Sequence, residues 1–508
     1  LDEALNGVPE LQIPRINTST SPGEGLTHLL KPGQRGKLPF LLQDGDGRLS
    51  LGDEAQALYD ELTNCLETGT ALPEWCVAKC SLKDERRPLS KIRKGKTRLL
   101  KIFPMVFNII CKQYFGICHA WMRQGDNECM VGINVGSIDW QHMIERHLRV
   151  GDRGTDGDFS CFQRYFTEDI SRFLYEGFYE PFHREHGELD AHKDLRARLF
   201  SECLVCTLLV QKFYVRSIPA NHSGIFGTTE RNCLVVGLLM RYAWLEVARR
   251  VKPSWATMTH FERWVVLSTY GDDHIQSRHE LVSWYNFPNI RDAMSSMGIT
   301  YTAANKEENA APDKRVLDLD FLKLTTREDS IVPGVRYYAA PHLPDLYPTL
   351  CWVTRGLPGA IHENADACLR RAFGCGRDTF ETLRRKIKRA FASAELSANP
   401  ITFETCISLF QRRALSFDAM EDEESDPCAR IPKPEWRGLR ARGLDDFDLS
   451  RHRGDIAYAQ GDLGVEFEGV EAKAPVLNGS ALPDDAATDE MRHSFQSILA
   501  IPRHVANY

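Results

Sequence analysis

Asp272 and Asp273 stand side by side, directly after Gly271 and a short apolar run. The run at 263–270 and the stretch at 274–277 both have the composition of strands, so these three residues are predicted to form the tip of a hairpin. An ordinary turn is one interpretation, because Gly-Asp is a common turn pair. A metal site is the other, because Mg²⁺ binds one or two protein carboxylates and lets substrate phosphates complete its octahedron.

Asp158 supplies a further carboxylate, at the start of a short mixed run that follows Gly157. We expect this run to be a second strand, although an aspartate in a Gly/Asp-rich turn fits the sequence equally well. Two metal ions held about 3.5–4 Å apart can activate an attacking hydroxyl and stabilise a leaving pyrophosphate. Asp158, Asp272 and Asp273 are therefore candidates for such a site, and ordinary turns remain the alternative.

A glycine-containing loop opens an apolar helix between these two carboxylate segments. Ser223, Gly224 and Gly227 lie in the loop, while Thr228 and Asn232 are spaced i, i+4 and so share one helical face. Such a loop can bring backbone close to a nucleotide. A plain helix N-cap is the alternative.

A basic stretch occupies positions 79–101, where ten Lys or Arg residues accompany only two acidic ones. Its second half is predicted to be a strand in which Lys94, Lys96 and Arg98 share one face. Three cations on one side suit a triphosphate. A solvated basic loop remains the alternative.

The whole chain of 508 residues has a net charge of −7 and is 43% hydrophobic, so it can bury a sizeable core. No apolar run approaches the ~18–20 residues of a membrane span, and no secretory signal is present, so we expect no transmembrane segment. The chain begins at Leu1 without a methionine, which predicts a fragment or a processed product. An acidic protein with one basic channel is compatible with an RNA partner.

The elements that must position these residues change character along the chain. Residues 1–50 predict loops, 51–150 mixed helices, and 151–330 short strands alternating with helices. From about 340 the pattern becomes helical. One helical stripe there consists of Phe380, Leu383, Ile387 and Phe391.

Beyond the helical part, six carboxylates fall within the nine residues 418–426. The remainder, 427–508, is rich in Pro, Gly and Asp and predicts a peripheral tail or a partly disordered extension.

Other metal sites find little support. Cys203 and Cys206 have no second cysteine pair at zinc spacing, so free thiols in a reducing cytosol are expected. The segment 183–186 lacks the HxxxH spacing of a helical zinc pair, and the segment 44–48 lacks the Gly and Glu that a calcium loop requires. Both segments are predicted to be surface loops.

In this order and spacing, these segments resemble the RNA-dependent RNA polymerase of picorna-like positive-strand RNA viruses. The resemblance covers roughly residues 1–330, and several independent motifs agree. It assigns Thr20, Ser21, Pro22 and Gly23 to template entry; Lys83, Arg87, Lys91, Lys96 and Arg98 to the nucleotide triphosphate; Ser223, Gly224, Gly227, Thr228 and Asn232 to the nucleotide sugar; Lys306 to pyrophosphate protonation; and Lys323, after Phe321 and Leu322, to the primer grip.

The fold that this resemblance implies is an α+β right-hand polymerase, with fingers, a palm built on an antiparallel sheet, and a helical thumb. The implied domains are N-terminal fingers at 1–151, which begin almost at the template-entry motif and so look truncated; palm at 152–180; a fingers/palm connection at 181–222; palm at 223–335; thumb at 336–416; and a C-terminal extension at 417–508.

The implied activity is template-directed RNA synthesis for viral genome replication. Asp158, Asp272 and Asp273 would hold two Mg²⁺ ions, for which Mn²⁺ could substitute, the primer 3′-hydroxyl would attack the nucleotide α-phosphate, and Lys306 would be the general acid. The implied partners are an RNA template, a primer or product strand, NTPs, a protein primer and other viral replication proteins. The implied location is the host cytoplasm, at replication complexes on membranes.

Gln163 departs from the resembled family, which carries there a second aspartate that senses the ribose 2′-hydroxyl. A catalytically silent RNA-binding scaffold is therefore an alternative function. A reverse transcriptase shares the palm carboxylates, but the loop at 223–232 and the basic stretch at 83–98 favour the RNA polymerase.

Overall fold

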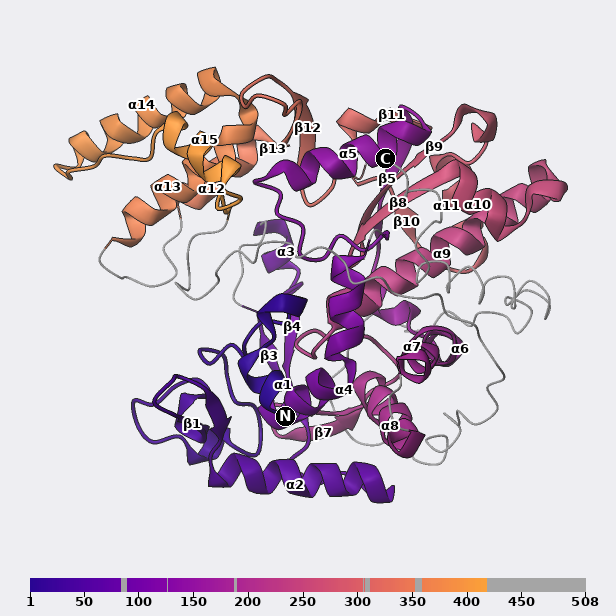
Figure 1. Ribbon diagram of the computed structural model, residues 1–508, viewed down its shortest axis with the longest axis vertical. Coiled ribbons are helices and arrows are strands. Elements are labelled where there is room, and N and C mark those ends of the chain that lie inside the picture. The colour runs from indigo at the N-terminus through magenta and orange to yellow at the C-terminus, as the bar shows by residue number, and fades with distance from the viewer. Residues whose placement is uncertain are drawn as a thin grey trace. The chain divides into compact units, whose positions relative to one another are not determined.

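The computed structural model describes residues 1–417, interrupted by a few short gaps (Figure 1). Arg87, the acidic run and the predicted tail lie outside the described residues. In its described residues the chain divides into two compact units, the first with Leu1–Asn127 and Cys161–Leu238, the second with Glu128–Ser160 and 239–417. The gaps are 84–88, 126, 187–189, 305, 307–310 and 352–358.

The first unit combines helices with a four-stranded sheet of order β4-β3-β6-β7, in which only the β3–β6 pair is parallel. Helix α4 is almost wholly buried and forms much of the core. Its elements are α1 (Asp2–Asn6), β1 (Leu41–Gln43), β2 (Leu49–Leu51), α2 (Asp53–Thr68), β3 (Ala78–Leu82), α3 (Leu89–Arg93), β4 (Leu99–Ile102), α4 (Met105–Gln124), α6 (Glu168–Leu174), α7 (Glu180–Glu185), α8 (Lys193–Leu204), β6 (Thr207–Val210), β7 (Phe213–Arg216) and the start of α9 (Thr228–Val251).

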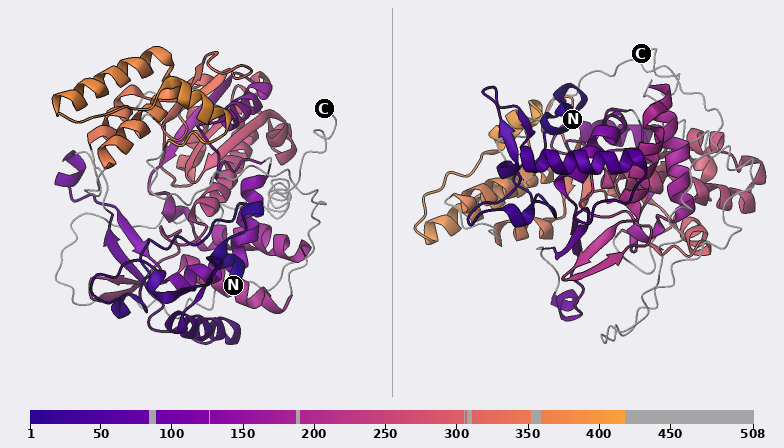
Figure 2. Two further views of the ribbon diagram at one scale, coloured as in Figure 1. Left: turned by 60° about the vertical axis from the view of Figure 1, so that its left-hand side comes forward. Right: turned by 90° about the horizontal axis from the view of Figure 1, so that it is seen from below.

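The second unit is built on an antiparallel sheet of order β10-β5-β9-β8, with β11 also paired to β5. Helices α12 to α15 follow, with α13 and α14 in contact and α14 in contact with α15 (Figures 1 and 2). Its elements are α5 (Ile138–Val150), β5 (Arg153–Phe159), the rest of α9, α10 (Met258–Trp264), β8 (Val265–Tyr270), β9 (Asp273–Arg278), α11 (Phe287–Ser296), β10 (Tyr301–Thr302), β11 (Lys314–Arg315), β12 (Leu324–Glu328), β13 (Tyr337–Pro341), α12 (Leu343–Cys351), α13 (Ala360–Ala372), α14 (Arg377–Ser393) and α15 (Phe403–Gln411).

Helix α5 packs on this sheet and fixes its strands. Trp140 and Ile144 share an apolar cluster with Ile275 of β9. His147 lies between two strands, with Nδ1 2.9 Å from Ser277 Oγ and Nε2 2.8 Å from Ser268 Oγ. Burial holds the pKa of His147 well below its ordinary value, so the ring is neutral and serves as a structural tie.

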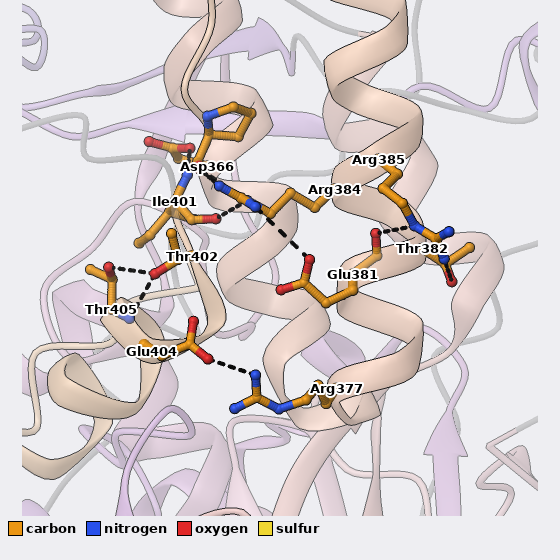
Figure 3. A network of polar contacts seen from close by, with 11 residues as sticks. Asp366, Arg377, Glu381, Thr382, Arg384, Arg385, Ile401, Thr402, Glu404 and Thr405 are labelled. Atoms are coloured by element: carbon orange, nitrogen blue, oxygen red, sulfur yellow. Dashed lines mark hydrogen bonds and ion pairs between the residues drawn. The ribbon is translucent and has the colours of Figure 1, made fainter.

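The predicted helical stripe is confirmed, because all four of its residues are buried on α14 in one core with α13 and α15. The arginines around it are not all solvated. Arg384 Nε donates to the carbonyl oxygens of Pro400 and Ile401, at 3.1 Å each, while Asp366 accepts from the backbone N–H of Ile401 at 2.9 Å (Figure 3).

Three predictions about local structure were wrong. Residues 94–98 are not a strand: α3 ends at Arg93, Gly95 has a φ of +61°, and β4 begins only at Leu99. Residues 263 and 264 belong to α10, so that strand begins at Val265. The segment 183–186 is not a surface loop, because residues 183–185 belong to α7, His186 caps that helix and His183 is fully buried.

Within the described part of the chain, no helix has the length and apolarity needed to cross a membrane. The mixture of helices with a mainly antiparallel sheet agrees with the predicted α+β class.

Candidate active site

The predicted hairpin tip is present at the end of β8 and β9. Tyr270 pairs with Asp273, which leaves Gly271 and Asp272 as a two-residue loop. Gly271 has a φ of +66°, a left-handed conformation that glycine adopts without a steric penalty. The sequence therefore folds here into a tight turn that carries both carboxylates on a rigid tip.

Asp158 lies near the end of β5, not at its beginning as predicted. Its strand pairs Gly157 with His274, so one further step in the same register places Asp158 opposite Asp273. On its other side Asp158 pairs with Thr302. The three predicted metal carboxylates thus come from two neighbouring central strands and the loop beside them.

Gly157 permits this close arrangement. A Cβ at Gly157 would stand 2.0 Å from the hydroxyl of Tyr301, so no larger residue fits without displacing that ring. The same hydroxyl lies 2.9 Å from Nε2 of His274, whose Nδ1 lies 3.2 Å from the carbonyl oxygen of Asp272. Burial lowers the pKa of His274 to about 4, so the neutral ring donates to that carbonyl and holds the loop in place.

Asp273 is a buried carboxyl that lies among other carboxyls. Burial, together with the nearby Asp320, Asp272 and Asp158, raises its pKa to about 7. The N–H of Leu322 donates to Asp273 at 2.7 Å and opposes the shift only in part. Carboxylates held together at such an electrostatic cost form a site that favours a cation.

Lys306 contacts this cluster directly, as its ammonium group forms an ion pair with Oδ2 of Asp158. Its backbone has a φ of +60°, which is uncommon for a residue with a side chain. The structure therefore brings together Asp158, Asp272, Asp273 and Lys306, the four residues for which chemistry was predicted.

Sequence reasoning missed a second set of charges beside the first. Asp156 is buried two residues before Asp158, on the same face of β5, and Lys314 Nζ lies 2.8 Å from its Oδ2. The backbone N–H of Asp320 donates to Asp156 at 2.9 Å, and His342 Nε2 lies 2.7 Å from Asp320 Oδ2. The two-residue spacing of Asp156 and Asp158 was the available signal.

The predicted primer-grip residue lies in a strained turn next to the cluster. Phe321 and Leu324 pair with each other across two residues, Leu322 with a φ of 57° and Lys323 with a φ of 59°. Two positive φ values define the hairpin turn that normally selects Asn-Gly. Here residues with side chains adopt it, and the turn directs the Leu322 N–H at Asp273 while Lys323 is exposed.

These carboxylates fit a bound Mg²⁺ in type, since Mg²⁺ prefers carboxylate oxygens, and a nearby cation would favour the ionised form of Asp273. In the described residues, no three His, Cys, Asp or Glu side chains are already arranged as a complete metal site.

The predicted sugar-sensing loop belongs to the first unit. Gly224 has a φ of +86°, and a Cβ there would stand 2.2 Å from the carbonyl oxygen of Lys101. Gly227 has a φ of +77°, and a Cβ there would stand 2.0 Å from the ring of His119. Both glycines are therefore required by the backbone, and the loop is held tightly where Thr228 begins α9.

The loop ends in a polar network that the sequence did not reveal. Asn221 Nδ2 donates to Asn232 Oδ1 at 2.6 Å, so the predicted residue Asn232 has a partner inside the unit. Ser223 is exposed, and its Oγ lies 3.5 Å from the carbonyl oxygen of Leu99. Gln163 is also exposed, in the short helical turn Phe162–Tyr165.

The predicted triphosphate residues that the structure describes are exposed around α3. Lys91 lies on that helix, and the backbone N–H of Lys96 bonds the Lys91 carbonyl at 2.9 Å, which curls the segment into a turn. Lys83 donates its backbone N–H to the Arg98 carbonyl at 2.9 Å. These cations therefore project from a helix and its closing turn instead of from one strand face.

The template-entry residues are anchored at the start of α4. Met105 donates its backbone N–H to the Pro22 carbonyl at 2.8 Å, and a Cβ at Gly23, whose φ is +78°, would stand 2.5 Å from the Phe103 carbonyl. Thr20 accepts a hydrogen bond from Lys37, and Ser21 Oγ accepts from the N–H of Gly23 at 3.2 Å.

Known proteins match much of the chain. The replicase polyprotein of Drosophila C virus (strain EB) is 27% identical over 417 residues, which cover 78% of this chain and 23% of the polyprotein. The genome polyprotein of Rice tungro spherical virus (strain A) is 27% identical over 436 residues, covering 80% of this chain and 12% of the polyprotein. The chain thus spans less than a quarter of the length of these curated relatives.

A solved structure and a family profile agree with these matches. The Sicinivirus 3Dpol RNA dependent RNA polymerase superposes with a TM-score of 0.64 at 17% identity, over 82% of this chain and 81% of that one, which shows the right-hand polymerase fold. The profile described as viral RNA-dependent RNA polymerase matches residues 6–366. Because that match covers well over half of its length, the chain belongs to the RNA-dependent RNA polymerase family of picorna-like viruses.

Proposed function

We propose that the chain extends an RNA 3′-hydroxyl with NTPs under the direction of an RNA template, releasing pyrophosphate, and so replicates a viral genome. The observation that carries this proposal is the crowding of Asp158, Asp272 and Asp273 at one end of the central sheet, where the pKa of Asp273 rises to about 7. Carboxylates gathered in this way fit two divalent cations and a polyphosphate substrate.

Asp158, Asp272 and Asp273 would hold Mg²⁺, or Mn²⁺ as a substitute. When bound, the ions would lower the pKa of the attacking hydroxyl and neutralise charge on the leaving group. The role of the chain itself is positioning: the two-residue loop, the neutral His274 and the Leu322 N–H hold the carboxylates in fixed places. Fixed charges of this kind need no reorganisation during the reaction.

Lys306 is proposed to donate a proton to the leaving pyrophosphate. Its ion pair with Asp158 places an ammonium group beside the predicted metal carboxylates, which supports this role. When a cation binds Asp158, the lysine would be released from that pair, and the negatively charged pyrophosphate would become its partner.

The remaining assigned residues are proposed to bind substrates. Lys83, Arg87, Lys91, Lys96 and Arg98 would neutralise the triphosphate, and Ser223, Gly224, Thr228, Asn232 and Gln163 would bind the nucleotide sugar. Thr20, Ser21, Pro22 and Gly23 would contact the template, and Lys323 the primer strand. We also propose a protein primer and other viral replication proteins as partners, and replication complexes on host cytoplasmic membranes as the location.

The test is primer extension on an RNA template with Mg²⁺, comparing the parent with Asp272→Ala and Asp158→Ala. Both variants should lose nucleotide addition and keep RNA affinity, because Lys and Arg residues away from the carboxylates supply most phosphate contacts. Asp292→Ala is the matched control, an exposed carboxylate on α11 of the same unit, and should retain full activity.

More than a few per cent of residual activity in Asp272→Ala would overturn the two-metal assignment. A parent that binds RNA but adds no nucleotide, while Gln163→Asp does, would favour the silent scaffold instead. The observation behind that second candidate is the amide at position 163.

A further inference from the structure

Asn221 is a buried residue whose side-chain amide is bonded at both ends. Its Nδ2 donates to the Thr228 carbonyl at 2.8 Å and to Asn232 Oδ1 at 2.6 Å. Its Oδ1 accepts from Nε of Arg231 at 3.0 Å. Only 4% of Asn221 is exposed, and Arg231 is fully buried, so water does not compete for these bonds.

Only one orientation of the Asn221 amide satisfies these neighbours. The Arg231 guanidinium can only donate, and the Thr228 carbonyl can only accept. Turning the amide by 180° would set its NH₂ group against Nε–H of Arg231 and its oxygen against the Thr228 carbonyl. Arg231 is always charged, so this preference persists over the whole working pH range.

The fixed orientation of Asn221 passes to Asn232, one helical turn into α9. Asn221 presents a donor, so Asn232 must turn its oxygen inward and its own NH₂ group the other way. Asn232 is half-buried, and its Oδ1 is the atom that bonds Asn221. The hydrogen bonds from Arg231 to Asn221 and from Asn221 to Asn232 therefore determine which end of the Asn232 amide is left to face a bound nucleotide.

We propose that Asn221 is a positioning residue for sugar selection: it holds Asn232 with its NH₂ group directed at the ribose 2′-oxygen. The inference rests on the proposed function, in which Asn232 and Gln163 bind the nucleotide sugar. It has particular weight in this chain because Gln163 has an amide where a carboxylate would only accept. An amide can present either end, so the locked Asn232 is the group that gives the sugar pocket a defined polarity.

The experiment compares incorporation of a ribonucleotide and its 2′-deoxy counterpart by the parent and by Asn221→Ala. The ratio of their kcat/KM values should fall about three- to tenfold, which at 1.4 kcal/mol per decade is about 0.7–1.4 kcal/mol. The fall should arise from the ribonucleotide alone, with deoxynucleotide efficiency unchanged within about twofold, because a deoxyribose offers no 2′-oxygen to bind.

Two further variants keep the test independent of folding. Asn221→Asp has the same shape and keeps an acceptor for Arg231, but it cannot donate, so Asn232 should turn round and the ratio should fall similarly. Asn127→Ala is the control: it removes a buried asparagine of the same unit that bonds the Met122 carbonyl at 3.0 Å, and it should leave the ratio unchanged.

A double variant separates positioning from direct contact. If Asn221 acts through Asn232, then Asn221→Ala added to Asn232→Ala should cause no further loss of the ratio. An additive loss would overturn the proposal. So would an unchanged ratio in both Asn221 variants, or an equal fall for both sugars, which is the result of a purely structural role.

Equilibrium affinities of ATP and 2′-deoxyATP for the Mg²⁺- and RNA-bound chain give the same ratio without catalysis. A parent that discriminates in binding but adds no nucleotide would refute the proposed function and leave the role of Asn221 standing. If the parent polymerises but Asn221→Asp discriminates as well as the parent does, the proposed function stands and the role of Asn221 is refuted.

Discussion

The carboxylate cluster at one end of the central sheet (Asp158, Asp272 and Asp273) and the helical bundle α13–α15 differ in how their charged groups are paired. In the bundle, charged groups meet partners of opposite sign or backbone groups: Arg377 lies 2.6 Å from Glu404, and Arg384 donates to two carbonyls (Figure 3). At the end of the central sheet, by contrast, burial and the neighbouring aspartates raise the pKa of Asp273 to about 7. Charges of the bundle are thus paired within the protein, whereas the carboxylate cluster keeps several carboxyls side by side.

Residues of the bundle thus contribute to the free energy of unfolding, whereas the buried carboxyl of Asp273 lowers it. Removing a bundle contact should cost stability and leave chemistry intact. Removing a carboxylate of the cluster should abolish nucleotide addition, and removing that of Asp273 should also increase stability. Substitutions of Asp273, Lys306 and Arg384 test this contrast, and one of Gln163 tests the proposed sugar site; they follow in order of their effect on nucleotide addition.

Asp273→Asn should abolish nucleotide addition and stabilise the metal-free chain at pH 8. The ordinary pKa of this carboxyl is 3.8 and its folded value is about 7. The cost of ionising it in the folded state is therefore absent below pH ~4, grows from pH ~4 to 7, and is complete above 7. A rise from 3.8 to about 7 corresponds to on the order of 4 kcal/mol of folding free energy, of which the Asn variant should recover a part.

The measurement is denaturant unfolding with a chelator at pH 4.5 and pH 8. The two proteins should differ least at the lower pH, and Asn should be the more stable at the higher one. If the Asn variant is less stable at pH 8, Asp273 stabilises the fold as the bundle residues do, and the contrast between the two regions is wrong.

Lys306→Leu should slow single-turnover addition by ~10²–10⁴-fold at saturating nucleotide, the usual contribution of a positioned general acid. RNA affinity should not change. Lys314→Leu is an informative comparison because Lys314 neutralises the buried Asp156 instead, so its loss should lower stability. If Lys306→Leu adds nucleotide at the parental rate, Lys306 is only a surface lysine.

Gln163→Asp should strengthen the preference for ribonucleotides by about five- to tenfold. Hydrogen bonds to charged groups contribute ~1.5–3 kcal/mol and neutral ones ~0.5–1.5, a difference of about 1–1.4 kcal/mol. Competition between matched ribo- and deoxyribonucleotides measures this preference. Equal or poorer discrimination by the Asp variant would refute this account of position 163.

Arg384→Ala should leave nucleotide addition by the folded enzyme unchanged and lower stability by about 1–2 kcal/mol, because the Pro400 and Ile401 carbonyls lose a charged donor. Lys388→Ala, an exposed residue on the same helix, is the control and should change neither property. A large loss of activity at full stability in Arg384→Ala would show that the bundle takes part in chemistry.

The sequence predicts best what depends on neighbours along the chain. The hairpin at Gly271, the helix that begins at Thr228 and the stripe on α14 all follow from local turn chemistry or periodicity, and all are present. The strand at 94–98 failed because alternating basic residues resemble a strand, while Gly95 with its positive φ closes a helical turn.

Contacts that depend on register could not be predicted. The ion pair of Asp156 with Lys314 and the hydrogen bond of Asn221 to Asn232 join residues that only the folded sheet or loop brings together. The burial of His183 likewise depends on how α7 packs, and its segment alone, with Arg and Glu between two histidines, indicates a surface.

The turn at Leu322 and Lys323 has a consequence for how the enzyme fails on heating. Each left-handed residue with a side chain costs on the order of 1–2 kcal/mol, which the surrounding structure must supply. When thermal motion loosens those surroundings, Leu322 loses its backbone strain by leaving this conformation. Its N–H then no longer donates to Asp273. Heat should therefore inactivate the enzyme, reversibly, at a temperature below that at which the sheet unfolds.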